Sequence, residues 1–241
     1  MQKRAPDIRL FSGAAGRLPA VKRSSTTTRM TRSSSSRGQG ARSHQPDPRA
    51  RGGGAHTIRI IGGDWKRTPL PVLDLDGLRP TPDRVRETLF NWLGQRLDGL
   101  RCLDLFAGSG GLGFEAASRG AARVVMVERS ARAAAQLRSN QARLGARMIE
   151  IAEADALRLA ANLAPGSFDV VFLDPPFGDT ALLERSLELA APLVAPDGWL
   201  YVESGEQIDP AARPALAGWS VVREGRAGAV HYHLLQRENE E

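Results

Sequence analysis

The 241-residue chain contains a single cysteine, Cys102, and this scarcity excludes a framework of disulfide bonds. Cys102 abuts an apolar stretch, where a small core residue is a simpler interpretation than a nucleophile. His231 and His233 alternate on the last expected strand, no other Cys or His has metal-ligand spacing, and we expect no metal site. Apolar runs stay well short of the roughly 18 residues that a membrane-spanning helix requires. These absences favour a reducing compartment, and we expect a cytoplasmic protein that does not enter a membrane.

The part of the chain that is expected to fold also lacks an excess of positive charge. Residues 1–55 hold twelve Lys and Arg against two Asp, a net charge of +10. Residues 56–241 hold 21 basic and 25 acidic residues, a net charge of −4, and the two values add to the +6 of the whole chain. The high isoelectric point therefore belongs to the first segment. RNA binding by the remainder depends on where its basic residues cluster.

Residues 1–55 are rich in Ser, Thr, Arg and Gly, show no apolar periodicity and are expected to be a disordered basic tail. Three interpretations remain open. The tail can be an arm that adds non-specific affinity for RNA. It can be an organelle-targeting segment, because it is rich in Arg and Ser and nearly free of acids. It can also be sequence upstream of the true start, with Met30 as an internal start.

Residues 98–238 alternate between the patterns of buried strands and helices. The expected strands are 102–106, 122–128, 147–152, 168–174 and 198–203, and the expected helices are 111–119, 130–144, 155–163 and 180–194. This alternation predicts an α/β fold with a doubly wound, mostly parallel sheet. Residues 219–228 and 230–235 read as two further strands joined by a glycine-containing turn, an antiparallel hairpin that closes a seven-stranded sheet.

Residues 56–97 precede this pattern and predict a small extension of a β-hairpin and a helix. The hairpin turns at Gly62-Gly63 and lies outside the main sheet. The helix has Thr81 as a plausible N-cap and Pro82 at its first position. Its core stripe at helical spacing is Val85, Leu89, Trp92 and Leu93.

A glycine-rich turn follows the strand 102–106 and opens the next helix. Gly108, Gly110 and Gly113 match G-x-G-x-x-G, a weak signal that alone suggests a dinucleotide. Asp104 lies within the preceding strand. A pyrophosphate at a helix N-terminus needs no carboxylate beside it, whereas a ligand carrying an ammonium and a sulfonium group would favour one.

Two further acids end the next two strands. Glu128 suits the two ribose hydroxyls of an adenosine, and Asp155 suits its adenine amino group. Parallel strands direct their carboxyl ends to one edge of the sheet. We therefore expect Asp104, Glu128 and Asp155 to face one crevice at the switch point of the sheet.

The strand 168–174 leads into the turn Asp174-Pro175-Pro176-Phe177. Proline has no backbone N–H, so this turn offers mainly acceptors, the Asp174 carboxylate and nearby carbonyl oxygens. Such a site suits a neutral group with two N–H donors that lies flat against Phe177. An exocyclic amino group of a nucleobase fits this description.

With these motifs the sequence closely resembles the bacterial 16S ribosomal RNA guanine-N2 methyltransferase family, which belongs to the class I S-adenosylmethionine-dependent methyltransferases. The resemblance covers roughly residues 58–237. The segments that carry it are 59–63, 79–93, 103–110, 174–177 and 201–203. Segment 79–93 is the most specific, because it is long and not general to methyltransferases. The basic stretch after the Gly-Gly turn departs from the family, which is usually richer there in Arg and Gly.

The resemblance implies S-adenosylmethionine as the cofactor and no metal. It implies a guanine of small-subunit ribosomal RNA as the substrate, within an assembling 30S subunit, and a monomeric enzyme. The residues implied for the cofactor are Asp104, Phe106, Ala107, Gly108, Ser109, Gly110, Glu128 and Asp155. The residues implied for catalysis are Asp174, Pro175, Pro176 and Phe177. The residues expected to contact RNA are Arg59, Lys66, Arg67, Arg79, Arg84 and Arg86.

Three other functions fit part of the sequence. An adenine-N6 methyltransferase of DNA or RNA would use the same Asp-Pro-Pro-Phe chemistry, but segment 79–93 and the absence of a separate DNA-recognition domain speak against it. An NAD-linked oxidoreductase would leave residues 174–177 and the closing hairpin unexplained. An RNA-binding module without activity would not require both an intact glycine turn and an intact Asp-Pro-Pro-Phe turn.

Overall fold

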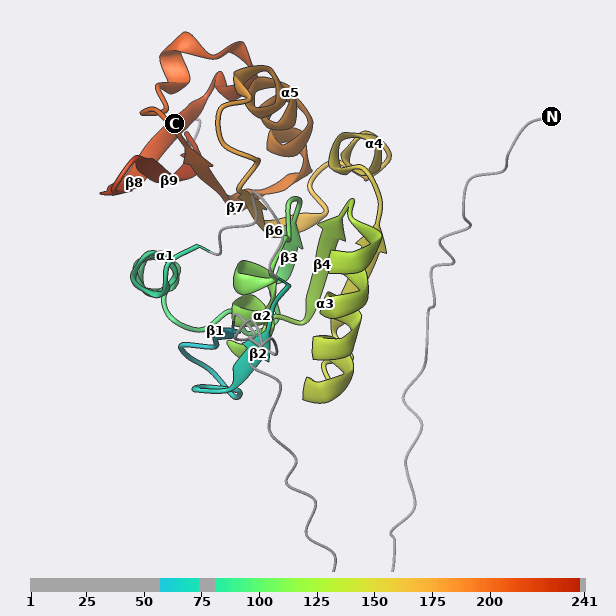
Figure 1. Cartoon of the computed structure of the whole chain (residues 1–241). Helices are drawn as coiled ribbons and strands as arrows, with labels where there is room; N and C mark the ends of the chain where they lie inside the picture. Colours follow the sequence, from blue (N-terminus) through green and yellow to red (C-terminus); the bar gives the residue numbers. More distant parts are fainter. Residues whose placement is uncertain (1–56, 74–80, 239–241) are drawn as a thin grey trace, which may run out of the picture. The chain divides into compact units, whose positions relative to one another are not determined.

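The computed structural model describes residues 57–73 and 81–238, and Figure 1 shows how their elements are arranged. The tail expected at residues 1–55 and the RNA contact expected of Arg79 lie outside the described residues. Within the described ranges, none of the helices has the length and apolar character that a membrane span requires.

A seven-stranded sheet with the order β5-β4-β3-β6-β7-β9-β8 forms the centre of the fold. Its strands are β3 (Arg101–Asp104), β4 (Arg123–Glu128), β5 (Ile149–Glu153), β6 (Phe168–Leu173), β7 (Val194–Ser204), β8 (Trp219–Ala227) and β9 (Val230–Arg237). The first five strands in this order are parallel, and β9 is antiparallel to both β7 and β8. The doubly wound sheet with its closing hairpin is confirmed, and the strand order reverses between β3 and β6.

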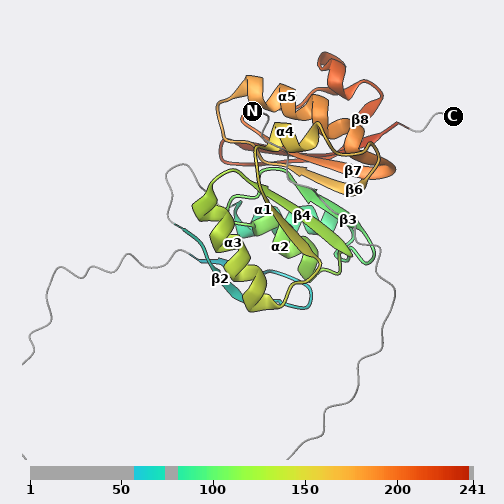
Figure 2. The same ribbon diagram turned by 90° about the vertical axis from the view of Figure 1, so that its right-hand side faces the viewer.

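Helices cover both faces of the sheet (Figure 2). One face carries α1 (Asp83–Trp92), α2 (Gly111–Ser118) and α3 (Ala131–Leu144), and the other carries α4 (Ala156–Ala160) and α5 (Thr180–Ala190). Successive strand side chains point to opposite faces. Cys102 and Phe172 therefore join the apolar cluster of the α1–α3 face, while Leu103 and Val171 join the cluster of the α4–α5 face.

Two helices are shorter than the sequence pattern indicated. The helix expected over 180–194 ends at Ala190 and continues as the 3₁₀ turn Ala191–Leu193, because Pro192 lacks the N–H that a further α-helical turn would use. The strand β7 then starts at Val194. The helix expected over 155–163 covers only Ala156–Ala160, with the side chain of Asp155 accepting a hydrogen bond at its start.

The hairpin of β1 (Thr57–Arg59) and β2 (Pro69–Pro71) forms a separate antiparallel pair, as expected. Its glycine turn lies on the C-terminal end of α2. The backbone N–H of Asp64 donates to the Ser118 carbonyl at 2.7 Å. Gly63 has φ +72°, and a Cβ there would lie 1.9 Å from the same carbonyl oxygen, so glycine is required for this close contact.

The extension shares its apolar core with the sheet. Ile60 and Leu70 from the hairpin and Leu89 from α1 belong to the same buried cluster as Cys102 and Phe172. The hairpin and α1 therefore complete the packing of the α1–α3 face.

Candidate active site

Four carboxylates lie in a row across four neighbouring parallel strands. Glu128 ends β4, Asp104 ends β3, Asp174 follows β6, and Glu203 is the next-to-last residue of β7. Each stands two residues beyond a side chain of the α1–α3 core, so all four point to that face of the sheet. The first three had roles expected from the sequence, and Glu203 had none. Glu203 could have been recognised as an acidic residue at an inward-facing position of an otherwise apolar strand.

Asp104 is buried beneath the glycine turn. Its Oδ2 accepts a hydrogen bond from the backbone N–H of Gly113 at 3.1 Å. Its Oδ1 is buried and has no partner among the described residues. Burial, together with the nearby charge of Asp174, raises the pKa of Asp104 to about 7. A bound cationic group with N–H donors would satisfy this oxygen and favour the ionised form.

The glycines of the turn serve the packing of the chain itself. Gly110 has φ +82°, and a Cβ there would lie 2.6 Å from the ring of Phe114. A Cβ on Gly113 would lie 2.7 Å from Met126 of β4. The motif thus allows α2 to pack closely on the sheet.

Glu128 connects the glycine turn to the start of α3. Its Oε2 accepts from the backbone N–H of Gly108 at 3.1 Å, and its Oε1 accepts from the backbone N–H of Ser130 at 2.6 Å. A carboxylate oxygen has two lone pairs, so each keeps capacity for one more donor. Asp155 is half-buried, and its Oδ1 accepts from the backbone N–H of Arg158 at 3.0 Å.

The remaining expected cofactor residues lie in the same turn. Ala107 and Gly110 are buried, and Phe106, Gly108 and Ser109 are half-buried. Their positions follow directly from the end of β3, so the structure brings them together beside Asp104 and Glu128.

Asp174 is held by a residue of the extension. The hydroxyl of Thr81 donates to Oδ2 of Asp174 at 3.2 Å. The expectation that Thr81 caps α1 is wrong: the helix starts at Asp83 with Pro82 in the cap position, and no side chain caps it. Burial raises the pKa of Asp174 to about 6, and the Thr81 hydrogen bond partly offsets this effect.

The rest of the Asp-Pro-Pro-Phe turn runs from the interior to the surface. Pro175 is buried, Pro176 is exposed, and Phe177 is 55% exposed. No other large apolar side chain in the described residues is as open to solvent. A ring in this position is available to contact a flat ligand beside Asp174.

Glu203 lies deeper, next to Asp174. It is 3% exposed, and its Oε1 accepts a hydrogen bond from the Tyr201 hydroxyl at 2.8 Å. Burial and the charge of Asp174 raise its pKa to about 8, while the hydrogen bond from Tyr201 acts in the opposite direction.

Four of the basic residues expected to contact RNA are exposed in the structure. They are Arg59, Lys66, Arg67 and Arg84. Arg59 lies on β1, Arg84 lies in the first turn of α1, and the other two lie in the turn of the hairpin.

Arg86 does not fit an RNA contact, because its side chain is only 1% exposed. It lies on the buried stripe of α1 between Val85 and Leu89. Its guanidinium donates to the carbonyl of Arg59 at 2.9 Å and pairs with the fully buried Glu115 at 3.5 Å. The helical spacing that placed Val85 and Leu89 in the core also applies to Arg86, and this was the signal that the sequence analysis missed.

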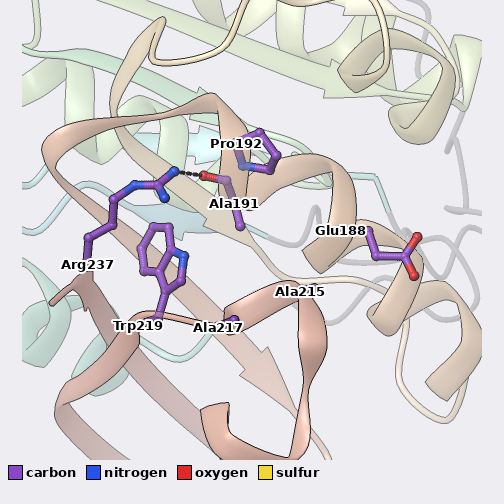
Figure 3. Close-up of a pocket in the computed structure, with 7 residues that line it drawn as sticks. All are labelled: Glu188, Ala191, Pro192, Ala215, Ala217, Trp219 and Arg237. Carbon is purple, nitrogen blue, oxygen red and sulfur yellow. Dashed lines mark hydrogen bonds between the residues drawn. The ribbon is translucent and has the colours of Figure 1, made fainter.

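A hollow of about 340 Å³ lies away from the carboxylate row, beside α5, the 3₁₀ turn Pro214–Leu216 and β8 (Figure 3). The guanidinium of Arg237 lies 4.7 Å from the centre of the Trp219 ring there and donates to the carbonyl of Ala191 at 2.8 Å. None of the four carboxylates lines this hollow, so it is not part of the candidate site.

Plain dinucleotide-binding folds lack an antiparallel pair of strands like β9 and β8 at the edge of the sheet. A bound pyrophosphate would gain nothing from a buried carboxylate such as Asp104 beside it. The fold and this site together define a class I S-adenosylmethionine-dependent methyltransferase. More narrowly, the chain belongs to the family described as Conserved hypothetical protein 95, which matches residues 58–236. The resemblance inferred from the sequence motifs is confirmed.

Curated relatives and solved structures agree with this placement. The chain is 44% identical over 191 residues to ribosomal RNA small subunit methyltransferase D of Escherichia coli K12, covering 77% of this chain and 92% of that protein. The Haemophilus influenzae protein of the same name is 42% identical over 186 residues, covering 74% and 93%. The solved structure of the putative methyltransferase yhhF from Escherichia coli matches with a TM-score of 0.67 and 41% identity, covering 76% of this chain and 99% of that one.

Proposed function

We propose that this protein transfers a methyl group from S-adenosylmethionine to the exocyclic N2 amino group of a guanine in small-subunit ribosomal RNA. The observation that carries the proposal is the pairing of Asp174, held by Thr81, with the exposed ring of Phe177. A nucleobase could use both residues at once, with its amino group donating to Asp174 and its ring stacking on Phe177. The names of the relatives, ribosomal RNA small subunit methyltransferase D, support the substrate class.

The residues beside the glycine turn fit the cofactor. Oδ1 of Asp104 would accept from the ammonium of its methionine part, and the backbone of residues 106–110 would line that part. Glu128 would accept from the ribose hydroxyls, and Asp155 from the adenine amino group. When bound, S-adenosylmethionine supplies a methyl group on a positively charged sulfur.

Asp174 has the central role on the substrate side. The lone pair of a guanine N2 is delocalised into its ring, so the amino group is a poor nucleophile. Asp174 and the carbonyl of Pro175 would accept its two N–H bonds, favouring a pyramidal nitrogen with its lone pair directed away from them. The nitrogen gains positive charge as it is methylated, so the ionised Asp174 stabilises the transition state more than the ground state.

Phe177 would stack on the target base after the base leaves its own stack. Exposed basic residues of the extension would bind the flanking phosphates. A role for Arg84 is supported by the contact of Thr81 with Asp174, because Thr81 lies just before α1, the helix that carries Arg84.

The proposal extends to the organisation of the molecule. Residues 56–97 would be the RNA-contacting extension and residues 98–238 the methyltransferase domain. A cytoplasmic monomer acting on an assembling 30S subunit follows from the family resemblance. Sedimentation of the protein alone, and with partly assembled subunits, would test these two points.

The decisive experiment is methyl transfer from labelled S-adenosylmethionine to small-subunit ribosomal RNA and partly assembled subunits from cells that lack this protein. After digestion to nucleosides, label in N2-methylguanosine is the expected result. Label in N6-methyladenosine would refute the proposed target atom.

An Asp174→Ala variant provides the matched test of mechanism. We expect it to bind the cofactor nearly as well as the wild type in calorimetry and to lose most of its turnover, about 100-fold or more. Full turnover by this variant would refute the role of Asp174.

A further inference from the structure

We propose that Glu203 is a positioning residue for Asp174, one that keeps its own proton through turnover and so leaves Asp174 as the ionised acceptor. The inference rests on the role proposed above for Asp174. Glu203 would neither touch the substrate nor take its proton.

The two acids are neighbours across adjacent parallel strands. Leu173 of β6 pairs with Val202 of β7, so Asp174 and Glu203 follow at the same level. Both point to the α1–α3 face, and adjacent strands lie roughly 4.8 Å apart. Two carboxylates this close cannot both be ionised without strong repulsion, so the pair is expected to hold one proton near neutral pH.

Each of the two acids accepts one hydrogen bond from a hydroxyl group. A hydroxyl carries a single hydrogen, and Thr81 donates it to Asp174 at 3.2 Å. The Tyr201 hydroxyl donates to Oε1 of Glu203 at 2.8 Å, a contact that the carbonyl oxygen of a neutral acid can accept as well as a carboxylate can.

Burial favours a proton on Glu203. Glu203 is almost enclosed, whereas Asp174 is half-buried. The less solvated acid keeps the proton more tightly. The pKa of Glu203, raised to about 8 by burial and by the charge of Asp174, is above the value of about 6 for Asp174.

The groups around Glu203 come from several elements. The titratable side chains that act on Glu203 are Asp104 from β3, Asp174 after β6 and Tyr201 from β7. Tyr232 from β9 lies near Tyr201, and Arg86 from α1 contacts Thr81. Arg86 is engaged with Glu115 and with the carbonyl of Thr81. These contacts hold Thr81 in place, and Thr81 then holds Asp174.

The test compares Glu203→Gln with Glu203→Ala. Gln keeps an acceptor for Tyr201 but cannot ionise, so we expect its kcat to stay within about threefold of the wild type. Ala removes this acceptor and should lower kcat by about 100-fold while the KM for the cofactor changes little. If Glu203→Gln is as inactive as Asp174→Asn, the proposal is overturned.

The pH profile supplies a readout that a purely structural role would not change. In the wild type, kcat should rise as Asp174 ionises, near pH 6, and fall as Glu203 ionises, near pH 8. The Glu203→Gln variant should keep the rise and lose the fall. Glu224→Gln, at an exposed acid of β8, makes the same Glu-to-Gln replacement away from the site and should leave the profile unchanged.

Infrared spectroscopy of the protein without RNA tests the proton directly. At pH 7, the spectrum of the wild type minus that of Glu203→Gln should contain the band of a protonated carboxyl group. The spectrum of the wild type minus that of Asp174→Asn should not. If the band of the protonated carboxyl group is instead lost in Asp174→Asn, the proposal is overturned. This measurement does not depend on whether guanine N2 is the target. Unfolding midpoints of each variant identify any failure to fold.

Discussion

Replacing Asp104 with Asn should make the protein without cofactor more stable at alkaline pH and unable to hold the cofactor tightly. The carboxyl of Asp104 is buried, and one of its oxygens has no partner among the described residues. Its pKa is raised from 3.8 to about 7. The folded state therefore binds this proton more tightly than the unfolded state, and the free energy of unfolding falls as pH rises from about 4 to about 7.

The size of the effect follows from that interval. A shift of about three pKa units, at roughly 1.4 kcal/mol each, corresponds to about 4 kcal/mol lost above pH 7. Asn avoids this loss but places an NH₂ group where Oδ1 had no partner, at a cost of about 1–3 kcal/mol. Asp104→Asn should thus be less stable than the wild type near pH 4 and more stable by about 1–3 kcal/mol at pH 8.

Urea unfolding between pH 5 and pH 8 would measure this difference. The stability of the variant relative to the wild type should increase by up to about 1.4 kcal/mol per pH unit up to pH 7 and then level off. Asp169→Asn is the control, because Arg101 shifts the pKa of Asp169 in the opposite direction, downward. This variant should be less stable than the wild type by the same amount at pH 5 and at pH 8. A relative stability of Asp104→Asn that does not change with pH would refute the electrostatic argument.

Calorimetry on the same variant tests the link to the cofactor. Loss of a charge-assisted hydrogen bond of about 1.5–3 kcal/mol should weaken S-adenosylmethionine binding roughly 10- to 150-fold. If the affinity for S-adenosylmethionine is unchanged, the ammonium group of the cofactor does not bind at Asp104.

Three further substitutions test other parts of the structure. Phe177→Ala should reduce kcat/KM for RNA by roughly 5- to 150-fold through lost stacking, while the unfolding midpoint, measured in parallel, stays unchanged because the ring is exposed. Glu115→Gln should destabilise the protein by about 3–5 kcal/mol in urea unfolding, since it removes the anion of buried Arg119 and leaves buried Arg86 with Asp83 alone, and a loss under 1 kcal/mol would contradict this. Gly63→Ala should lower the free energy of unfolding by clearly more than the roughly 1 kcal/mol expected for Gly94→Ala. Both glycines have positive φ, but only a Cβ at residue 63 would meet the Ser118 carbonyl. Equal losses of stability would disprove the contact.

Much of the fold was predictable because its signals are local. A strand such as Phe168–Leu173 is apolar on both faces, which is typical of a parallel strand covered by helices on both sides. The carboxyl ends of such strands meet at one edge, so Asp104, Glu128 and Asp155 could be expected to face one crevice from their positions alone. The early end of α5 was missed, because Pro192 outweighs the apolar pattern that continues past it.

The features that the sequence did not indicate depend on contacts between distant segments. Thr81 and Asp174 are 93 residues apart, and a threonine before Pro82 is locally indistinguishable from a helix cap. Arg86 and Glu115 carry charges typical of a surface, and only the docking of the extension on α2 buries them. Their mutual neutralisation is visible only in three dimensions.

The docking of the extension also determines how the chain can be divided for laboratory work. Four groups donate to Glu115, and three of them, the backbone N–H groups of Ile61 and Gly62 and the guanidinium of Arg86, come from residues before 98. A fragment that begins at residue 98 would leave this acid with Arg119 alone and expose the apolar surface beneath α1. Such a fragment should aggregate on expression, whereas one that begins near residue 57 retains the full set of contacts. Exchange of hairpins between relatives would likewise succeed only if α2 is transferred along with the hairpin.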